Sequence, residues 1–571
     1  MNRRDLLRKA AQAAILTTAA TTETITAESQ TPPIQSESLT IEDLAIADKV
    51  AGRSYNEAQR KLMLGVMTRT RAQIKAVRSS ELSETTEPAF HFDPRLPNIK
   101  LPIGKSSSRM SAGDPLEYDG NIESLAFASV VELSRLIKSR KVTSTELTKM
   151  YLDRLKRFSP MLLNVVTLTE ELALQQAAQA DTEIAAGKYR GPLHGIPWGA
   201  KDLLATKGIR TTYGAKPYEK QVFDYDAEVV KRLAAGGAVL VAKLSMGELA
   251  QGDVWYGGMT RNPWKPSTGS SGSSAGPGSA IAAGLVGFSI GTETLGSIVS
   301  PSVVNGVTGL RPTYGRVPRT GAMALCWTMD KIGPMCRGVE DCALVLSAIF
   351  GPDGKDASVT DTPFQWRPDM PLSKLRVGID SEAFAAVEKD AKRAPIYAEV
   401  RKTLDKLGVT LKPITLPKST PAYGSLASIF IDAESAAAFQ KLNSSGDLDL
   451  LARQTANAWP TTFRVGSTIP ASDYILAMRL RRRLQEEMAV SIADVDCFVT
   501  VPFLSQNLIY TNLTGHPTLV TRCGMLDGLP QMIEFVGQIY REDAILRMGL
   551  AYEKATTWHK QWPDLKAEAV R

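Results

Sequence analysis

The chain contains little cysteine and little histidine for its length. Among its 571 residues there are five cysteines and four histidines, and no pair of cysteines has the Cys-x-x-Cys spacing. A disulfide framework or a zinc site normally needs several closely spaced side chains of these two types. We therefore expect neither a disulfide-stapled fold nor a metal centre.

Long apolar runs and a strong excess of charge are also missing. No uninterrupted apolar run reaches the roughly 18 residues of a bilayer-spanning helix. The net charge is +7, and four basic residues against Asp5 place +3 of it within the first nine residues. The remainder is too weak to predict a nucleic-acid partner. Hydrophobic residues make up 43% of the chain, which is typical of a globular enzyme.

The first residues resemble an export signal. Arg3 and Arg4 precede two leucines and a mildly apolar, alanine-rich segment at Ala10–Ala20, an arrangement similar to a twin-arginine signal peptide. We predict such a signal over residues 1–30 and a periplasmic or other extracytoplasmic location. The alternatives are a basic amphipathic helix and a cytoplasmic protein.

The remainder of the chain is predicted to form two sections. Residues 31–123 are read as a linker and a helical extension, because Ile41–Val77 has the apolar spacing of helices. Residues 124–571 are read as a catalytic domain. Helix and strand patterns alternate there, and Thr143 with Glu146 predicts a capping box at the start of a helix. This alternation indicates an α/β layer architecture.

Three short motifs carry the chemistry: Gly195–Asp202, Ser271–Gly276 and Gly291–Ile298. Lys201 stands at the end of the first motif, after an apolar strand. Desolvation there would lower the pKa of its amine towards neutrality, so that the neutral amine could act as a general base. The alternative is a structural lysine that is paired with Asp202.

The third motif predicts a nucleophile. Ser297 follows a glycine-containing turn, which would expose its hydroxyl group. Backbone N–H groups of the turn, at Thr294, Leu295 and Gly296, could then converge on the oxyanion of a tetrahedral intermediate. The alternative is a simple polar loop.

The second motif places Ser273 24 residues before Ser297, since 297 − 273 = 24. Its surroundings, Ser267–Gly278, are low in complexity and could form a flexible linker. Pro263-Trp264 before the motif and an alanine-rich helix after it favour an ordered loop. Ser274 and Thr292 are candidate supporting residues of the same network.

The order and spacing of these motifs resemble the amidase signature family from about Ser124 to Trp562. The resemblance implies a large twisted mixed β-sheet with helices on both faces. It also implies a Ser-Ser-Lys triad in which Lys201 draws a proton from Ser297 through Ser273, and a cis peptide bond before Ser273. The expected partner is a small-molecule amide. No cofactor, metal ion, nucleic acid or membrane insertion is expected, and a homodimer is allowed.

Two positions depart from the family pattern. Leu295 stands where the family has glycine, and Val299 stands where many members have arginine. We predict a stand-alone amidohydrolase that acts on carboxylic amides. The alternatives within the family are a catalytically impaired binding homologue and a glutaminase-type subunit of a tRNA-dependent amidotransferase. An esterase with Ser274 in a Gly-x-Ser-x-Gly elbow and a phosphate-binding loop are weaker alternatives, because neither has the required neighbouring residues.

Overall fold

The computed structural model describes residues 39–78, 86, 88–97 and 99–565. The chain forms two compact units, which divide between Ser80 and Glu81. The predicted export signal at residues 1–30 lies outside the described residues. In the described ranges no helix combines the length and the apolar character needed to cross a membrane.

The first unit contains helices α2 (Ile41–Val50) and α3 (Glu57–Arg78). Thr40 caps α2 through a capping box with Asp43, which satisfies backbone N–H groups that the first turn leaves free. An ion pair between Asp48 and Arg60, 2.8 Å long, joins the two helices. Both helices lie where the apolar spacing of the sequence places them.

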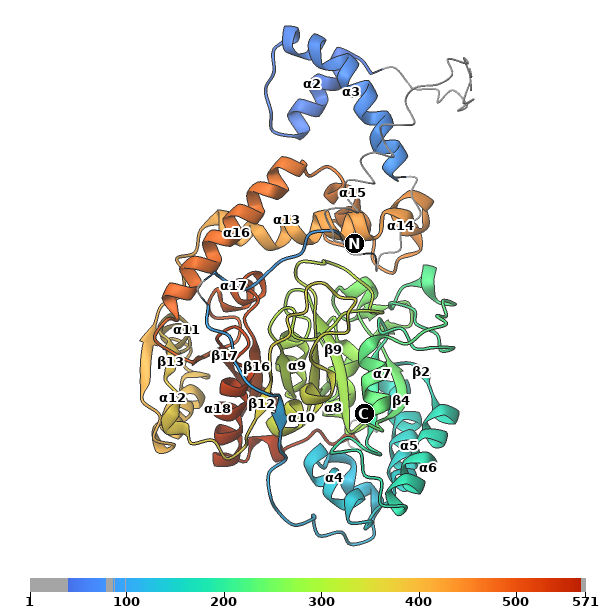
Figure 1. The fold of residues 1–571 in the computed structure, drawn as a ribbon, viewed down its shortest axis with the longest axis vertical. Helices are drawn as coiled ribbons and strands as arrows, with labels where there is room; N and C mark the ends of the chain where they lie inside the picture. Colours follow the sequence, from blue (N-terminus) through green and yellow to red (C-terminus); the bar gives the residue numbers. More distant parts are fainter. Residues whose placement is uncertain (1–38, 79–85, 87, 98, 566–571) are drawn as a thin grey trace, which may run out of the picture. The chain divides into compact units, whose positions relative to one another are not determined.

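An eleven-stranded mixed sheet organises the described part of the second unit (Figure 1). Its strands, in spatial order, are β14 (Leu411–Ile414), β13 (Val377–Asp380), β15 (Cys497–Thr500), β17 (Leu529–Gly537), β16 (Thr518–Leu526), β10 (Thr308–Arg311), β11 (Lys331–Cys336), β9 (Phe288–Glu293), β3 (Pro197–Lys201), β4 (Val239–Leu244) and β2 (Val165–Leu168). The strand β3 runs parallel to both β4 and β9, whereas β9, β11, β10, β16 and β17 pair antiparallel in turn.

Helices flank this sheet on both faces, so the predicted α/β architecture is confirmed. They are α4 (Val130–Lys138), α5 (Ser144–Leu162), α6 (Glu170–Ala185), α7 (Glu228–Ala235), α8 (Ala275–Ala282), α9 (Val299–Asn305), α10 (Val339–Ile349), α11 (Ser381–Val387), α12 (Ala394–Lys406), α17 (Asn507–Thr514) and α18 (Glu542–Ala555). The capping box of Thr143 and Glu146 opens α5, as the sequence predicts.

A second helical layer follows β14 in the sequence. It consists of α13 (Pro421–Ala438), α14 (Gln440–Ser445), α15 (Trp459–Gly466) and α16 (Ala471–Ser491). The helices α15 and α16 both pack on α13, and α16 also packs on α17 (Figure 1). The buried side chains of Phe430 and Leu484 belong to the cluster at these contacts.

The segment before α4 runs along the second unit as an extended arm. Its strand β1 (Ser107–Ser108) pairs in parallel with β12 (Gln365–Trp366). Further back, the buried ring of Phe92 contacts Tyr314 and the guanidinium group of Arg481. These side-chain contacts and this strand pairing attach the arm to the rest of the second unit.

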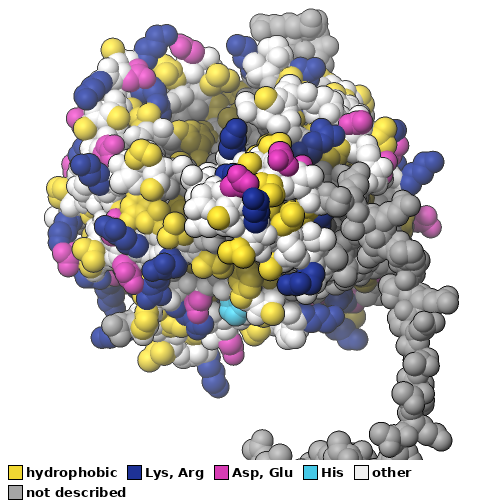
Figure 2. Space-filling view, turned by 90° about the horizontal axis from the view of Figure 1, so that it is seen from above, with side chains coloured by type: hydrophobic (Ala, Val, Ile, Leu, Met, Phe, Trp, Pro, Cys, Tyr) yellow, Lys and Arg dark blue, Asp and Glu magenta, His cyan; other side chains and the backbone are white. Residues whose placement is uncertain are grey.

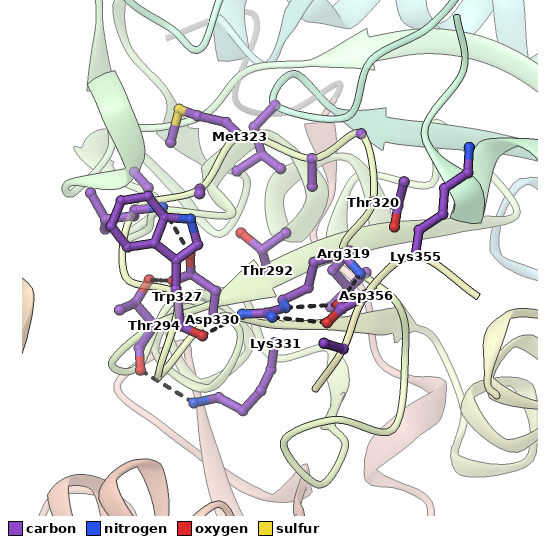
Figure 3. Close-up of a pocket in the computed structure, with 18 of the residues that line it drawn as sticks. Thr292, Thr294, Arg319, Thr320, Met323, Trp327, Asp330, Lys331, Lys355 and Asp356 are labelled. Carbon is purple, nitrogen blue, oxygen red and sulfur yellow. Dashed lines mark hydrogen bonds and ion pairs between the residues drawn. The ribbon is translucent and has the colours of Figure 1, made fainter. Parts of the chain in front are cut away.

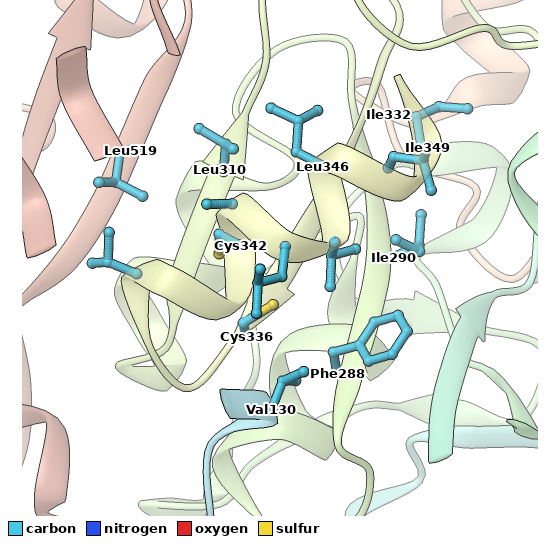
Figure 4. Packing of buried hydrophobic residues seen from close by; sticks show 14 of the residues in the cluster. Val130, Phe288, Ile290, Leu310, Ile332, Cys336, Cys342, Leu346, Ile349 and Leu519 are labelled. Carbon is cyan, nitrogen blue, oxygen red and sulfur yellow. The ribbon is translucent and has the colours of Figure 1, made fainter. Parts of the chain in front are cut away.

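The main core lies between the sheet and α10 (Figure 4). Cys342, Leu346 and Ile349 of α10 belong to the same buried cluster as Ile290 of β9 and Leu310 of β10. All five cysteines are buried and free, so they act as small apolar core residues. On the face seen in Figure 2, basic and acidic side chains are intermixed. The close packing fixes β9 and β3, and the candidate site is built at their ends.

Candidate active site

Lys201 is the last residue of β3, and its side chain is fully buried. Its Nζ atom donates hydrogen bonds to the hydroxyl oxygens of Ser273 at 2.8 Å, Thr292 at 2.8 Å and Ser274 at 3.1 Å. Because β3 and β9 are adjacent and parallel, their carboxyl ends meet at one edge of the sheet. This topology brings Lys201 to Thr292, 91 residues later in the chain.

Asp202 directly follows Lys201 in the sequence, but the two side chains do not pair. Its carboxylate lies 3.1 Å from the Nζ atom of Lys243 and accepts the backbone N–H of Thr212 at 2.9 Å. Successive residues at a strand end point to opposite sides, so the two side chains enter different environments. The alternative of a structural Lys201–Asp202 pair is therefore excluded.

The environment of Lys201 favours its neutral form. Burial lowers the pKa of its amine to about 7, and the carboxylates of Asp330 and Glu293 oppose this shift without cancelling it. The hydrogen-bonding atoms around the amine are hydroxyl and carbonyl oxygens, and these stabilise an ammonium ion less than a carboxylate would. Near neutral pH the amine can therefore accept a proton.

The serine-rich loop is ordered by its neighbours. It lies between the hairpin of β7 (Arg261–Asn262) and β8 (Lys265–Gly269) and the start of α8. The peptide bond between Gly272 and Ser273 is cis, as the family resemblance implies. A Cβ atom at Gly272 would lie 1.8 Å from the carbonyl oxygen of Gly252. The backbone is therefore packed too closely for any larger residue, which excludes a flexible linker.

Ser297 follows β9 and is 8% exposed. Its carbonyl oxygen accepts the N–H of Ser274 at 3.1 Å, which joins the two serine motifs directly. The Ser297 hydroxyl group makes no hydrogen bond to another residue in the described part of the chain. The structure thus brings Lys201, Ser273, Ser274 and Thr292 into one hydrogen-bonded network and holds Ser297 beside it through the backbone.

The turn before Ser297 presents free donors. Across the described ranges, the backbone N–H groups of Leu295, Gly296 and Ser297 donate to no protein acceptor. Gly296 has φ = +83°, which is a conformation that suits glycine. Leu295 avoids this region, and its side chain packs on the cluster that includes Phe430. The leucine therefore needs no unfavourable backbone angle.

Sequence reasoning missed the ion pair beneath this turn. The buried carboxylate of Glu293 lies 2.7 Å from the guanidinium group of Arg311 and accepts the N–H groups of Ile298 at 2.8 Å and Val299 at 2.9 Å. Burial alone would raise the pKa of Glu293, but Arg311 and Lys331 lower it to about 2. The position of Glu293 inside the third motif was the signal that could have found it.

A cavity of about 680 Å³ opens beside the network, a volume in the usual range for a small-molecule site. Thr292 and Thr294 form part of its wall next to the network (Figure 3). Apolar lining comes from Met323, Leu325 and Ile332 among others, and charged lining from Asp330, Lys331 and an ion pair of Arg319 with Asp356. The cavity has room for an organic molecule beside Thr292 and Thr294, whereas Lys201, Ser273 and Ser297 are not among its lining residues.

Comparison with known proteins agrees with this geometry. The family model described as Amidase matches residues 146–503. The chain belongs to the amidase family. A glutamyl-tRNA(Gln) amidotransferase subunit of Methylococcus capsulatus is 34% identical to this amidase, and the match covers 76% of the amidase and 98% of the relative. The corresponding protein of Pseudomonas syringae pv. tomato is 33% identical, with 76% and 99% covered.

Solved structures of related proteins have the same fold. The peptide amidase of Stenotrophomonas maltophilia has a TM-score of 0.70 and 29% identity to this amidase, covering 78% of it and 99% of the peptide amidase. The glutamyl-tRNA(Gln) amidotransferase subunit of Thermotoga maritima has a TM-score of 0.63 at 24% identity, covering 77% and 96%; this likeness concerns the fold alone. Together these findings identify the chain as an amide-hydrolysing enzyme.

The relatives contradict the predicted export. They are named as amidotransferase subunits for glutamyl-tRNA, and charged tRNA is used in the cytoplasm. The relatives therefore indicate a cytoplasmic protein, and the prediction of an extracytoplasmic location is wrong. Paired arginines are a short pattern, and the Thr-rich segment after them is more polar than the apolar core of a signal peptide.

The close packing at Gly272 leads to a first prediction. The substitution Gly272→Ala should displace Ser273 from Lys201, because the new Cβ atom would overlap the carbonyl oxygen of Gly252. We expect the rate at which a fluorophosphonate probe labels the protein to fall at least about tenfold, in line with the loss caused by small misplacements of reacting groups. The control is Gly424→Ala on α13, where the new methyl group meets open space. Equal labelling of both variants would contradict the packing argument.

Proposed function

We propose that this amidase cleaves carboxylic amides through a covalent acyl-enzyme formed on Ser297. In this proposal Lys201 is the general base and Ser273 relays the proton between them. The observation that carries the proposal is the fully buried Lys201 amine, 2.8 Å from the Ser273 hydroxyl oxygen and with a pKa lowered to about 7. Such an amine can take up and return a proton near neutral pH.

The proposed reaction has two stages. Neutral Lys201 takes the proton of Ser273, and Ser273 takes that of Ser297 while the Ser297 oxygen attacks the amide carbon. The oxyanion accepts hydrogen bonds from free N–H groups of the Thr294–Ser297 turn. The proton then returns through Ser273 to the leaving nitrogen, and the C–N bond breaks. Water repeats these steps on the ester and releases the acid.

We expect the hydrogen bond between the hydroxyl groups of Ser273 and Ser297 to form when substrate binds. Catalytic hydrogen bonds are often longer without substrate and tighten in the complex. Before substrate binds, the backbone hydrogen bond from the Ser274 N–H to the Ser297 carbonyl oxygen keeps the two serine motifs next to each other. Ser274 and Thr292 support the amine, since both hydroxyl oxygens accept from it.

The first candidate for the biological role is a glutaminase-type subunit, which the curated relatives favour. They match along 98–99% of their own length at 33–34% identity. In this role the amide would be the side chain of glutamine, and the released ammonia would pass to a partner protein. The chain would then work with other protein subunits. The prediction of a stand-alone enzyme includes no such protein partners.

A stand-alone amidase is the second candidate. Its support is the likeness to peptide amidase structures at 29% identity and a TM-score of 0.70. The cavity of about 680 Å³ with apolar walls also suits an amide that is larger than glutamine. An impaired binding homologue is disfavoured, because Leu295 is accommodated and the serine–lysine network is assembled.

The triad residues give the most direct test. We expect Ser297→Ala, Ser273→Ala and Lys201→Met each to lower kcat by about 10³-fold or more, as removal of nucleophile or base does in serine hydrolases. The matched control is Ser289→Ala: this serine is buried on β9, and its hydroxyl group donates to the carbonyl oxygens of Pro277 and Met335 at 3.3 Å. Amide turnover that survives in the Ser297 variant would refute the proposal.

The pH profile tests the role of Lys201. Its pKa of about 7 means that the amine is mostly protonated, and unable to act as a base, below this pH. We expect the single-turnover rate of acyl-enzyme formation to rise about tenfold per unit as the pH increases towards 7. A histidine could also produce a rise near pH 7, but burial lowers the pKa of His516 to about 3, so this histidine does not titrate between pH 5 and 7. A rate that stays constant between pH 5 and 7 would argue against an amine base.

A substrate panel separates the two candidate roles. The measurement is ammonia release by the full-length chain from glutamine, aliphatic amides, aromatic amides and peptide amides. If the protein is a glutaminase-type subunit, kcat/KM for glutamine should exceed that for every other amide by about tenfold or more. The opposite order, with a peptide amide preferred by a similar margin, would reject this role and favour the stand-alone amidase.

A further inference from the structure

A second buried lysine lies directly behind the turn that carries the nucleophile. Lys331 is the first residue of β11, opposite Glu293 of β9 in the ladder, and it is only 3% exposed. Its Nζ atom donates hydrogen bonds to the carbonyl oxygens of Thr294, at 3.4 Å, and of Met329. Figure 3 shows the Lys331 side chain reaching Thr294 at the wall of the cavity.

We propose that Lys331 is a positioning residue for amide cleavage: by binding the carbonyl oxygen of Thr294, it orients and polarises the backbone N–H of Leu295 towards the oxyanion. This inference rests on the proposed function, since it concerns the same reaction. It assigns to Lys331 a role that neither the sequence motifs nor the relatives assign to it.

The geometry of a peptide unit supports this role. The peptide bond between Thr294 and Leu295 is trans, so its C=O and N–H groups point in opposite directions. A cation that holds the carbonyl oxygen of Thr294 therefore directs the N–H of Leu295 away from β11. A hydrogen bond to the carbonyl also polarises the N–H of the same peptide unit. The Leu295 donor would become both better placed and stronger.

The other end of the turn is held by the opposite charge. Glu293 accepts the N–H groups of Ile298 and Val299, immediately after the nucleophile. Lys331 thus holds the first carbonyl group of the turn and Glu293 holds the amides that follow it. The intervening N–H groups are left without protein acceptors in the described chain, as an oxyanion site requires.

Lys331, rather than the residues at positions 299 and 311, supplies a positive charge to the carbonyl group of the turn. Val299 is fully buried in an apolar cluster with Val520 and Met532, so it contributes no charge where the family pattern has arginine. Arg311 is engaged with Glu293 at 2.7 Å and donates to the backbone carbonyl of His516 at 2.8 Å. The Nζ atom of Lys331, in contrast, donates a hydrogen bond to the turn itself, at the carbonyl oxygen of Thr294.

The charge of Lys331 changes near neutral pH. Burial, with help from Arg311 and Arg481, lowers the pKa of Lys331 to about 7, against the opposing effect of Glu293 and Asp330. The ammonium form is therefore lost as the pH rises through this region. Lys201 must lose its proton in the same region to act as a base. On the acidic side of this region, the rate of amide cleavage should rise as Lys201 loses its proton. On the alkaline side it should decline to a lower plateau as Lys331 loses its proton.

Two substitutions of Lys331 and one control test this inference. The variants are Lys331→Met, which removes the charge, and Lys331→Arg, which keeps a charge that does not titrate. The control is Lys412→Met: Lys412 lies on β14 at the far edge of the same sheet and pairs with Asp494 at 2.5 Å. The readouts are kcat and KM on an amide, the pH profile, and the rate of Ser297 labelling by a fluorophosphonate probe.

We expect Lys331→Met to lower kcat and the labelling rate by about 10- to 100-fold, somewhat less than complete loss of an oxyanion donor, with KM within about threefold of the wild type. The alkaline decline should disappear in Lys331→Met and in Lys331→Arg, and the arginine variant should recover part of the lost rate. The Lys412→Met control should match the wild type.

The inference is overturned if Lys331→Met keeps wild-type kcat and labelling, or if the alkaline decline persists in a folded variant. Should Lys331→Met fail to fold, the pH profile of Lys331→Arg decides alone: loss of the alkaline decline supports the role, and an unchanged profile rejects it. Failure of the proposed function looks different, because wild-type Ser297 would then not be labelled at all.

Discussion

The amine of Lys201 is buried among hydroxyl groups, and no carboxylate of the described residues lies at hydrogen-bonding distance from it. A buried lysine normally either keeps its charge beside a carboxylate or loses its proton. This chain contains both outcomes on neighbouring strands. Lys243 on β4 pairs with Asp202, whereas Lys201 on β3 contacts Ser273, Ser274 and Thr292. The difference in partners makes one lysine structural and leaves the other able to exchange a proton.

The order of strands in the mixed sheet maintains that arrangement. The parallel neighbours β3 and β9 end together, so the Lys201 amine and the turn at Thr294–Ser297 emerge at the same edge of the sheet. The antiparallel strand β11 then returns along β9 and brings Lys331 behind the turn. The buried charge of Glu293 is tolerated here because it binds Arg311 and two backbone amides, which offsets its cost of desolvation.

Family membership and biological role rest on different observations. The family match identifies an amide-hydrolysing enzyme without naming the amide. The curated relatives are amidotransferase subunits, whereas structures at 29% identity are peptide amidases. The same fold therefore serves both roles. The relatives also correct the location that the first residues of the sequence suggested.

The sequence by itself determined the α/β architecture, the capping box at α5 and the three motifs with Lys201, Ser273 and Ser297. These features depend on residue type and local spacing, which a single sequence displays. The tertiary structure alone decided that Asp202 pairs with Lys243 and that Leu295 packs on an apolar cluster. It also decided that Glu293, Arg311 and Lys331 lie around the turn at Thr294–Ser297. Such contacts join residues that lie far apart in the chain, and their existence depends on strand order and register, which local patterns do not encode.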